Sequence, residues 1–410
     1  MDCVLNNNNR NSRLRIRLSL NVNFSFLVIL SSCLCLLIQF YSLPYSKTGW
    51  ISLSNRILLI IWIVVIGIVL FKRMIKPISG EAIYVVLIAV WTVVSWMFAA
   101  VSNPASAVDN ALRTAGFLMV PIMLGYNWFF KMDPRVKKIV VATMLLAAIL
   151  FILLYHSNLR NVYQGPYGSV QISAVTLGYS NPNQTAMYTF LCAIGLFTGA
   201  AYMQSKYLKV FFFTLGCYIA RVMFATESRT TALLFVVFAA MAIYVRKRQI
   251  PRFWIHFAYV LPLAYLVLSI VLPLLGQAIT FMGESIFTGR EEIYDRYFDR
   301  LNLLTFFFGD MNFFQYQNLH NGYIAIAAST GVPVCVAYIK LIKSMLLRSC
   351  PDLSASVYER IAFVGFLCAI MNTGSEAALL VGGSQYAFLL FCLVILFTKP
   401  KAEPKKGDEL

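Results

Sequence analysis

The sequence predicts an all-α polytopic membrane protein with about 12 transmembrane helices and with both termini in the cytoplasm. Three observations lead to this fold class. The 410 residues are 60% hydrophobic and 12% charged, with a mean hydropathy of +0.72, which leaves too little polar surface to cover a water-soluble globule. Apolar stretches of about 20 residues, enough for a helix to cross a bilayer, recur along the chain. Positive charges collect on one side of these stretches.

The apolar stretches set the order of the predicted elements. We expect spans near residues 22–42, 53–71, 82–101, 114–130, 139–155, 184–203, 209–226, 230–245, 253–275, 321–342, 358–375 and 384–398. A basic leader, 1–21, precedes this single transmembrane domain, 22–398, and a tail, 399–410, follows it. The first stretch is long for a cleaved signal and lacks a clear small-residue cleavage site, so we expect a retained helix.

The distribution of Lys and Arg predicts which side of the membrane each connection occupies. With a cytoplasmic N-terminus, 25 of the 34 Lys and Arg residues fall on the cytoplasmic side. This bias, together with attraction to anionic lipid headgroups, accounts for the net charge of +17 without nucleic-acid binding.

Two predicted external loops are long enough to carry function, at 156–183 and 276–320. The second contains Thr288 three residues before Glu291, a capping box that starts a helix. Apolar residues then recur at helical spacing with charged residues between them: Ile293, Tyr294, Tyr297, Phe298, Leu301 and Leu304. The pattern predicts an amphipathic helix along the outer membrane surface, between spans nine and ten.

Three arginines stand out against the charge bias. Arg290 falls in the first turn of the predicted amphipathic helix, where free N–H groups and a forked guanidinium favour a phosphate. Arg229 starts span eight on the external side, and Arg221 lies within span seven, where a charge is costly unless paired or functional. The structural alternatives are an Arg290 contact with Glu291 or lipid phosphate, and Arg229–Glu227 or Arg221–Glu376 ion pairs.

His320 is one of only three histidines and stands directly before the predicted span 321–342. If that span is one helix, His320 lies at its outer end and Gly331 returns to nearly the same face. A histidine there can exchange a proton near neutral pH, and the alternative is an interfacial residue bonded to a loop carbonyl. We assign no role to His156 or His256. The nine cysteines show no zinc or dithiol spacing, so we expect neither a metal nor a disulfide.

Several segments together resemble the bacterial O-antigen ligase and O-antigen or capsular polysaccharide polymerase superfamily. The segment "LHNGYIAIAASTGVP", 319–333, is similar to the family's His-Asn motif, with a glycine eleven residues after the histidine. "SRTTALL", 228–234, and "TGREEIY", 288–294, are similar to its two Arg-bearing segments. "GYSNPNQTA", 178–186, is similar to its Asn-Pro-Asn stretch. The resemblance covers roughly residues 178–340.

The resemblance implies a glycosyltransferase of the bacterial cytoplasmic membrane, with its active site on the periplasmic side. It would transfer a glycan from an undecaprenyl-diphosphate carrier to a sugar hydroxyl, with inversion and without metal or nucleotide cofactor. His320 would be the general base, and Arg229 and Arg290 would bind the diphosphate. We assign substrate binding to Asn321, Arg221, Asn183 and Tyr179. Expected partners are the carrier-linked oligosaccharide, the glycan acceptor, the lipid bilayer, a flippase and a chain-length regulator.

Three functions remain open at this point. We favour a polymerase, because no feature peculiar to a ligase is evident beyond the shared motifs. An O-antigen ligase would use the same carrier, base and cations with a lipid-core acceptor. A polysaccharide flippase or other transporter would place charges near the midplane on broken helices or repeats, whereas here the unusual charges collect on one side.

Overall fold

The computed structural model describes most of the chain between residues 82 and 398. The described residues are 82–107, 118, 120–121, 124, 134–156, 162–167, 170–175, 177, 182–274, 280–281, 284–285, 290–314, 319–376 and 384–398. The leader, the tail and the predicted spans 22–42 and 53–71 lie outside this part, as does most of the predicted span 114–130.

Helices dominate the described residues. They are α3 (Ala82–Ser102), the short 3-10 helix η1 (Pro104–Ser106), α6 (Pro134–Tyr155), α7 (Pro182–Tyr202), α8 (Lys206–Phe224), α9 (Arg229–Tyr244), α10 (Arg252–Leu274), α11 (Arg290–Phe298), α12 (Leu303–Phe308), α13 (Met311–Phe314), α14 (Gly322–Thr330), α15 (Val332–Ser349), α16 (Val357–Asn372) and α18 (Ser384–Phe397). Helices α3, α6–α10, α16 and α18 coincide closely with predicted spans.

Within the described residues, five helices are long and apolar enough to cross a membrane: α3, α6, α7, α8 and α10. The central one is α7, most of whose residues are buried among α6, α8, α9, α16 and α18. By contrast, α3 and α10 expose much of their apolar surface, including Val90, Met97, Leu263 and Val267. Apolar helices with this exposure are what a bilayer surrounds, which supports a membrane protein.

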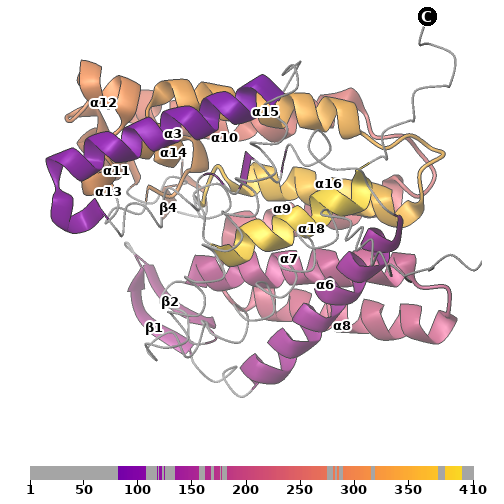
Figure 1. Ribbon diagram of the computed structural model, residues 1–410. Coiled ribbons are helices and arrows are strands. Elements are labelled where there is room, and N and C mark those ends of the chain that lie inside the picture. The colour runs from indigo at the N-terminus through magenta and orange to yellow at the C-terminus, as the bar shows by residue number, and fades with distance from the viewer. Residues whose placement is uncertain are drawn as a thin grey trace, which may run out of the picture.

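The helices stack in three tiers. In Figure 1, α3, α10 and α15 form the upper tier, α9, α16 and α18 the middle one, and α7 and α8 the lower one, with α6 crossing at an angle. Helix α10 packs on α16, α16 on α7, and α7 on α8. One hydrophobic core of buried side chains runs through these contacts.

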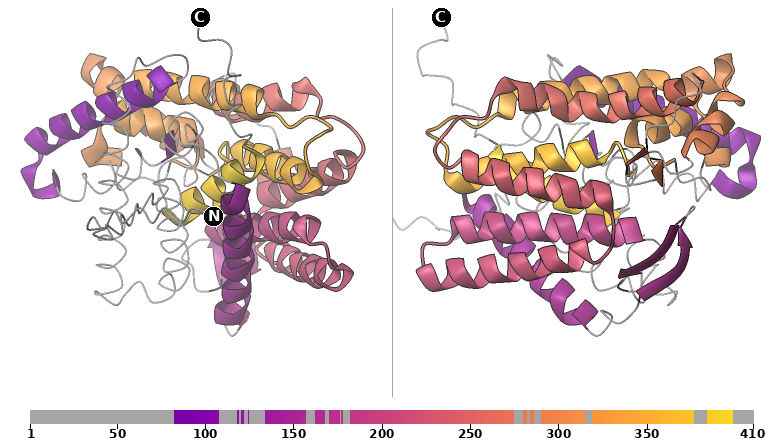
Figure 2. Two further views of the ribbon diagram at one scale, coloured as in Figure 1. Left: turned by 45° about the vertical axis from the view of Figure 1, so that its right-hand side comes forward. Right: turned by 180° about the vertical axis from the view of Figure 1, so that it is seen from behind.

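The connections between the helices lie at two opposite ends of the structure. Strands β1 (Val162–Tyr167) and β2 (Val170–Val175) pair antiparallel, as do β3 (Thr280–Phe281) and β4 (Glu284–Ser285). These hairpins lie with α11 and α13 at one end, on the left in Figure 1, which we name the hairpin end. The connections α7–α8, α9–α10 and α15–α16 lie at the opposite end, as the view from behind in Figure 2 also shows.

The structure corrects three expectations about the elements. In the part of the chain that the structure describes, the fold is helical apart from the two hairpins, which lie in the predicted external loops 156–183 and 276–320. The expected amphipathic helix ends at Phe298, and Asn302 and Thr305 form a second capping box that starts α12. Because that box satisfies the first amides of a new helix, Leu301 and Leu304 do not continue the face of α11.

The third correction concerns the predicted span 321–342, which is two helices, α14 and α15. They meet at Gly331, whose φ of 95° lies outside the helical region, and Pro333 follows in the first turn of α15. A Cβ at Gly331 would stand 2.0 Å from the carbonyl oxygen of Phe307. The reason for the break is therefore the close passage of the α12 end, which only a glycine permits. The prediction that Gly331 shares a helical face with His320 was wrong, because it assumed a continuous helix.

Candidate active site

His320 stands in a strained backbone conformation directly before α14. Its φ is 48°, in the left-handed region that non-glycine residues seldom adopt. Such a conformation costs on the order of 1–3 kcal/mol and persists only where its surroundings hold it. The side chain is largely buried, with 17% of its surface exposed.

The side chain of Asn321 makes hydrogen bonds that help to fix this backbone conformation. Its side-chain oxygen accepts hydrogen bonds from the backbone N–H groups of Tyr323 and Ile324, which caps α14. Its side-chain nitrogen donates to the carbonyls of Pro262 and Gly374, at 3.0 and 3.1 Å. The residue is fully buried, so its amide joins α14 to α10 and to the turn after α16. This is the geometry of a positioning residue rather than of a direct contact with substrate.

The turn after α16 brings a carboxylate to His320. The N–H of Gly322 donates to the carbonyl oxygen of Thr373, which ties this turn to the start of α14. Glu376 Oε1 then lies 3.5 Å from His320 Nδ1, and only 4% of the Glu376 side chain is exposed. A carboxylate at Nδ1 can orient the imidazole ring and leaves Nε2 to exchange a proton with a reactant.

Arg290 is the cation of the site. As the first residue of α11 it donates from Nη1 to the hydroxyl of Tyr265 on α10 at 2.8 Å, and its guanidinium lies 5.7 Å from the centre of that ring. Burial by itself would lower the pKa of Arg290, but its interactions with Tyr265, Glu376 and Tyr294 outweigh burial and raise it. The guanidinium therefore stays charged and senses the same carboxylate as His320.

Helix α11 is fixed to the protein and does not only rest on a surface. Tyr294 and Tyr297 are buried in a small cluster with Leu319, Ile324, Ala325 and Ala328, against Leu266 and Ile270 of α10. This packing brings Arg290 near enough to Glu376, the partner of His320, for the two charges to interact, although the three residues come from distant parts of the chain.

The site is set back from the hairpin end. Asn321 bonds to Pro262, which lies near the middle of α10 and about 18 Å along the helix from Leu274. His320 is therefore not at the outer tip of a span, as the single-helix prediction had it. The hairpin end lies farther along α10, toward Leu274.

The other predicted site residues lie apart from this cluster or outside the described residues. Arg221 and Arg229 are exposed, near the hairpin-end tips of α8 and α9, and no contact recorded among the described residues joins either to His320, Arg290 or Glu376. The alternative ion pairs, Arg229–Glu227 and Arg221–Glu376, are likewise not recorded in that part of the chain. Asn183 is half-buried in the first turn of α7. Tyr179 and Thr288 lie outside the described residues.

Backbone strain is concentrated at connections of the hairpin end. The non-glycine residues with positive φ in the described ranges are Leu177, Glu227 and His320. Leu177 lies two residues after the end of β2, and Glu227 lies in the turn before Arg229. In that turn the carbonyl of Ala225 accepts a hydrogen bond from the N–H of Val175. Strain of this kind clusters at functional sites, which favours this end of the molecule as the working end.

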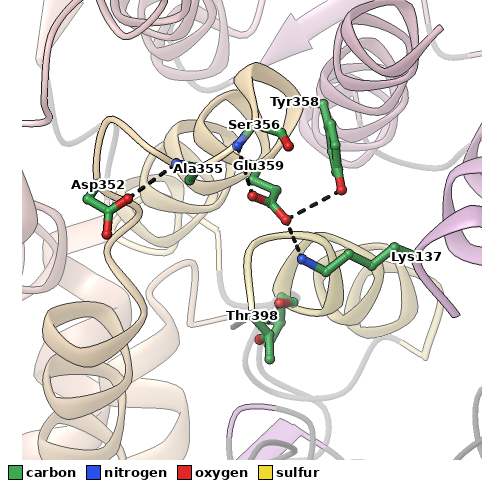
Figure 3. A network of polar contacts seen from close by, with 8 residues as sticks. Lys137, Asp352, Ala355, Ser356, Tyr358, Glu359 and Thr398 are labelled. Atoms are coloured by element: carbon green, nitrogen blue, oxygen red, sulfur yellow. Dashed lines mark hydrogen bonds and ion pairs between the residues drawn. The ribbon is translucent and has the colours of Figure 1, made fainter. Parts of the chain in front are cut away.

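A second polar network, at the opposite end, is structural. Glu359 is bonded to Lys137 of α6, to the hydroxyl of Tyr358 and to the N–H of Ser356, whose side chain completes a capping box (Figure 3). Buried Arg360 donates to the carbonyls of Leu353 and Arg246. These contacts fasten α6 and the α9–α10 turn to the start of α16.

Sequence reasoning did not find the roles of Glu376 and Tyr265. Glu376 was considered only as a partner of Arg221, although a carboxylate at the end of a predicted span, on the same side as His320, was an available signal. Nothing in the sequence distinguishes Tyr265 from the other 21 tyrosines. In the described ranges, no group of three or more His, Cys, Asp or Glu side chains is placed to hold a metal ion.

Comparisons of this chain with models of protein families, with curated proteins and with solved structures give no match.

Proposed function

We propose that the protein is a membrane glycosyltransferase that polymerises undecaprenyl-diphosphate-linked oligosaccharide units on the external face of the bacterial cytoplasmic membrane. The observation that carries the proposal is the convergence of His320, Glu376 and Arg290 in a strongly apolar helical protein. A proton acceptor and a fixed cation within one site suit the transfer of a group from a diphosphate to a hydroxyl.

The reaction is a single displacement at the anomeric carbon. The acceptor hydroxyl oxygen forms the new bond to that carbon while the bond to the diphosphate oxygen breaks, and undecaprenyl diphosphate leaves with the electron pair. His320 Nε2 takes the hydroxyl proton, and Glu376 at Nδ1 stabilises the imidazolium that results. Arg290 stabilises the charge on the leaving diphosphate. One displacement inverts the configuration of the sugar.

Arg229 completes the proposed site through the substrate rather than through protein contacts. It is exposed at the start of α9, at the hairpin end from which the cluster is set back. A carrier-linked oligosaccharide is an extended molecule, so its sugars or its diphosphate can contact Arg229 as a second cation. Arg221, Asn183 and Tyr179 keep their proposed role in substrate binding on the same basis.

A transporter is the alternative from a different class, because the helix break at Gly331 and the position of the cluster near the middle of α10 are features that transporters share. In transporters the freed backbone groups at such breaks line the path of the cargo. Here the protein itself occupies them: Ser95 Oγ donates to the carbonyl of Thr330, and the N–H of Asp310 donates to that of Ala328. This favours a structural break over a transport path.

The choice between polymerase, ligase and transporter is tested by acceptor and compartment. The purified protein is supplied in detergent with carrier-linked repeat units, with and without a lipid-core acceptor. A ladder of carrier-linked products without the lipid core supports a polymerase, and products that appear only on the lipid core support a ligase. Absence of any new glycosidic bond, together with movement of the units across proteoliposomes, would overturn the enzyme proposal.

A further inference from the structure

Helix α12 and the residues beside it form an apolar segment in the stretch predicted as an external loop. Its sequence, "LLTFFF", leaves Leu303 77% exposed and Leu304 56% exposed, and Phe306 and Phe307 are also exposed. We name these four residues the α12 face. Holding such a surface in water costs about 25 cal/mol for each Å² of apolar area, so its surroundings need an explanation.

The position of α12 along α3 indicates what surrounds this apolar surface. Trp91 Nε1 donates to the carbonyl of Phe307, and the ring of Phe308 stacks on Trp91 and lies 4.4 Å from the centre of the Phe98 ring. Trp91 is near the middle of α3, about 16 Å along the helix from Ser102. Figure 1 shows α12 beside α3, a helix long and apolar enough to cross a membrane. The end of α12 therefore lies beside the middle of α3 and not at the end of that helix.

The chain then turns back toward the hairpin end. Gly309, with φ of 72°, makes the turn, and α13 follows. Asn312 of α13 donates from its side chain to the carbonyl of Ala99 and accepts from Ser106 Oγ, beyond the end of α3. Helices α12 and α13 therefore form a hairpin that enters and leaves on the same side.

The polar groups at the tip of this hairpin are paired with protein. Besides the Phe307 carbonyl, the N–H of Gly309 donates to Thr305 and the N–H of Asp310 to Ala328. The Asp310 carboxylate lies 3.9 Å from the guanidinium of Arg300. Non-helical backbone at membrane depth is tolerated only where protein or water satisfies it, and here protein does so.

We infer that α12 and α13 form a re-entrant hairpin, whose α12 face contacts the hydrocarbon chains of the bilayer. The exposed residues Val90 and Met97 of α3 adjoin Trp91 and Phe98, which contact the α12 end, so one hydrocarbon environment would cover both surfaces. Because α12 follows α11 after four residues, the bilayer anchors the helix that carries Arg290. The inference concerns membrane contact and holds whether or not the proposed reaction is correct.

The experiment compares quenching from the lipid and from the water. An environment-sensitive fluorescent amino acid replaces Leu304 or Phe306 in the full chain, reconstituted in nanodiscs. Val90 serves as the control within an apolar helix, and exposed Asp295 of α11 as the control in water. Lipids brominated on the acyl chain and aqueous iodide are the two quenchers.

We expect positions 304 and 306 to behave like position 90, with strong quenching by brominated lipid and at least about threefold less quenching by iodide than at position 295. Strong iodide quenching at both positions would overturn the inference. Weak quenching by both reagents would also overturn it, because a protein partner would then cover the face. On the unsubstituted protein, a diazirine-bearing phospholipid should label residues 303–307, and its failure to do so while labelling α3 would contradict the inference.

Discussion

His320 and Glu376 are each held by the backbone of the other's segment. The Gly322–Thr373 and Asn321–Gly374 hydrogen bonds join the two segments, so the 3.5 Å approach of the ring to the carboxylate is built into the fold. A fixed carboxylate lowers the reorganisation needed when the imidazole becomes charged. The strain at His320 is the cost of this placement.

Replacing Glu376 by Gln should separate catalysis from binding. We expect kcat to fall about tenfold or more, the equivalent of about 1.4 kcal/mol or more, because the imidazolium loses its partner. Binding of undecaprenyl diphosphate should be unchanged or tighter, because Arg290 loses a competing carboxylate. Glu376→Asp should restore part of kcat. Weaker carrier binding with unchanged kcat would contradict this role.

Arg290 should act through its forked donors as well as its charge. Arg290→Lys keeps the charge but loses the planar geometry, so we expect undecaprenyl diphosphate to bind about tenfold more weakly. Arg296→Lys, on the exposed side of the same helix, is the matched control and should bind normally. Binding is measured by native mass spectrometry in nanodiscs. Equal affinities in both variants would mean that Arg290 only fastens α11 to Tyr265.

Asn321 is expected to contribute mainly to stability and placement. Asn321→Ala removes the α14 cap and leaves the buried Pro262 and Gly374 carbonyls without their donor, at a cost on the order of 2 kcal/mol. Asn321→Asp retains the cap but sets a carboxylate oxygen against the same two carbonyls at a fully buried position, so it should lose at least as much. Thermal unfolding in detergent checks the order of the two variants. An unchanged midpoint with lost activity would instead indicate contact with substrate.

At the scale of elements, hydropathy is sufficient to locate helices that bury or expose apolar faces. The predicted spans from 139–155 to 253–275 coincide with α6–α10 because each carries enough apolar residues to pack or to meet lipid. The α14–α15 break was not predictable from the same pattern. It depends on the passage of Phe307 beside Gly331, a contact between segments that hydropathy does not encode.

The break supplies a stability prediction. Gly331→Ala forces an L side chain to φ of 95° and brings its Cβ to 2.0 Å from the Phe307 oxygen, so we expect a loss on the order of 3 kcal/mol. The control is Gly195→Ala in α7. Its Cβ would stand 3.0 Å from the flexible end of Met144 and in ordinary contact, at 3.6 Å, with the Cβ of that residue, so its stability should stay within about 1 kcal/mol of the wild type. Similar unfolding midpoints for both variants would contradict the break as described.

The contact between α6 and α16 gives a second stability prediction. Lys137 and Glu359 are 13% and 17% exposed, so Lys137→Gln leaves a largely buried carboxylate and should cost on the order of 2 kcal/mol. Lys138→Gln, its exposed neighbour, is the control and should change stability little. Thermal unfolding of the solubilised variants decides, and equal midpoints would show that the capping box alone holds Glu359.

At the scale of the whole molecule, both hairpins and the strained turn at Glu227 lie at the hairpin end, and the His320 cluster is set back from that end. His320 and Arg290 were predicted site residues because both are unusual for their setting, a rare histidine and an arginine at a helix start, and their catalytic roles stay predictions. That Glu376 and Tyr265 would join them was not predicted, since that follows from how α10 and α16 pack. The roles of Arg229, Arg221, Asn183 and Tyr179 stay predictions.

The most direct test of the proposed reaction compares the number of glycosidic bonds formed with the amount of undecaprenyl diphosphate released. Purified protein receives carrier-linked repeat units, and new glycosidic bonds and free undecaprenyl diphosphate are quantified together. We predict one carrier diphosphate released for each bond in the wild type and in His156→Ala. His156 is the control position because its ring bonds to the hydroxyl of Tyr218 and no role in the site is assigned to it. His320→Ala should remain folded and fall by at least about a hundredfold. A His320→Ala variant that keeps forming bonds, or bonds formed without release of the carrier, would contradict the account.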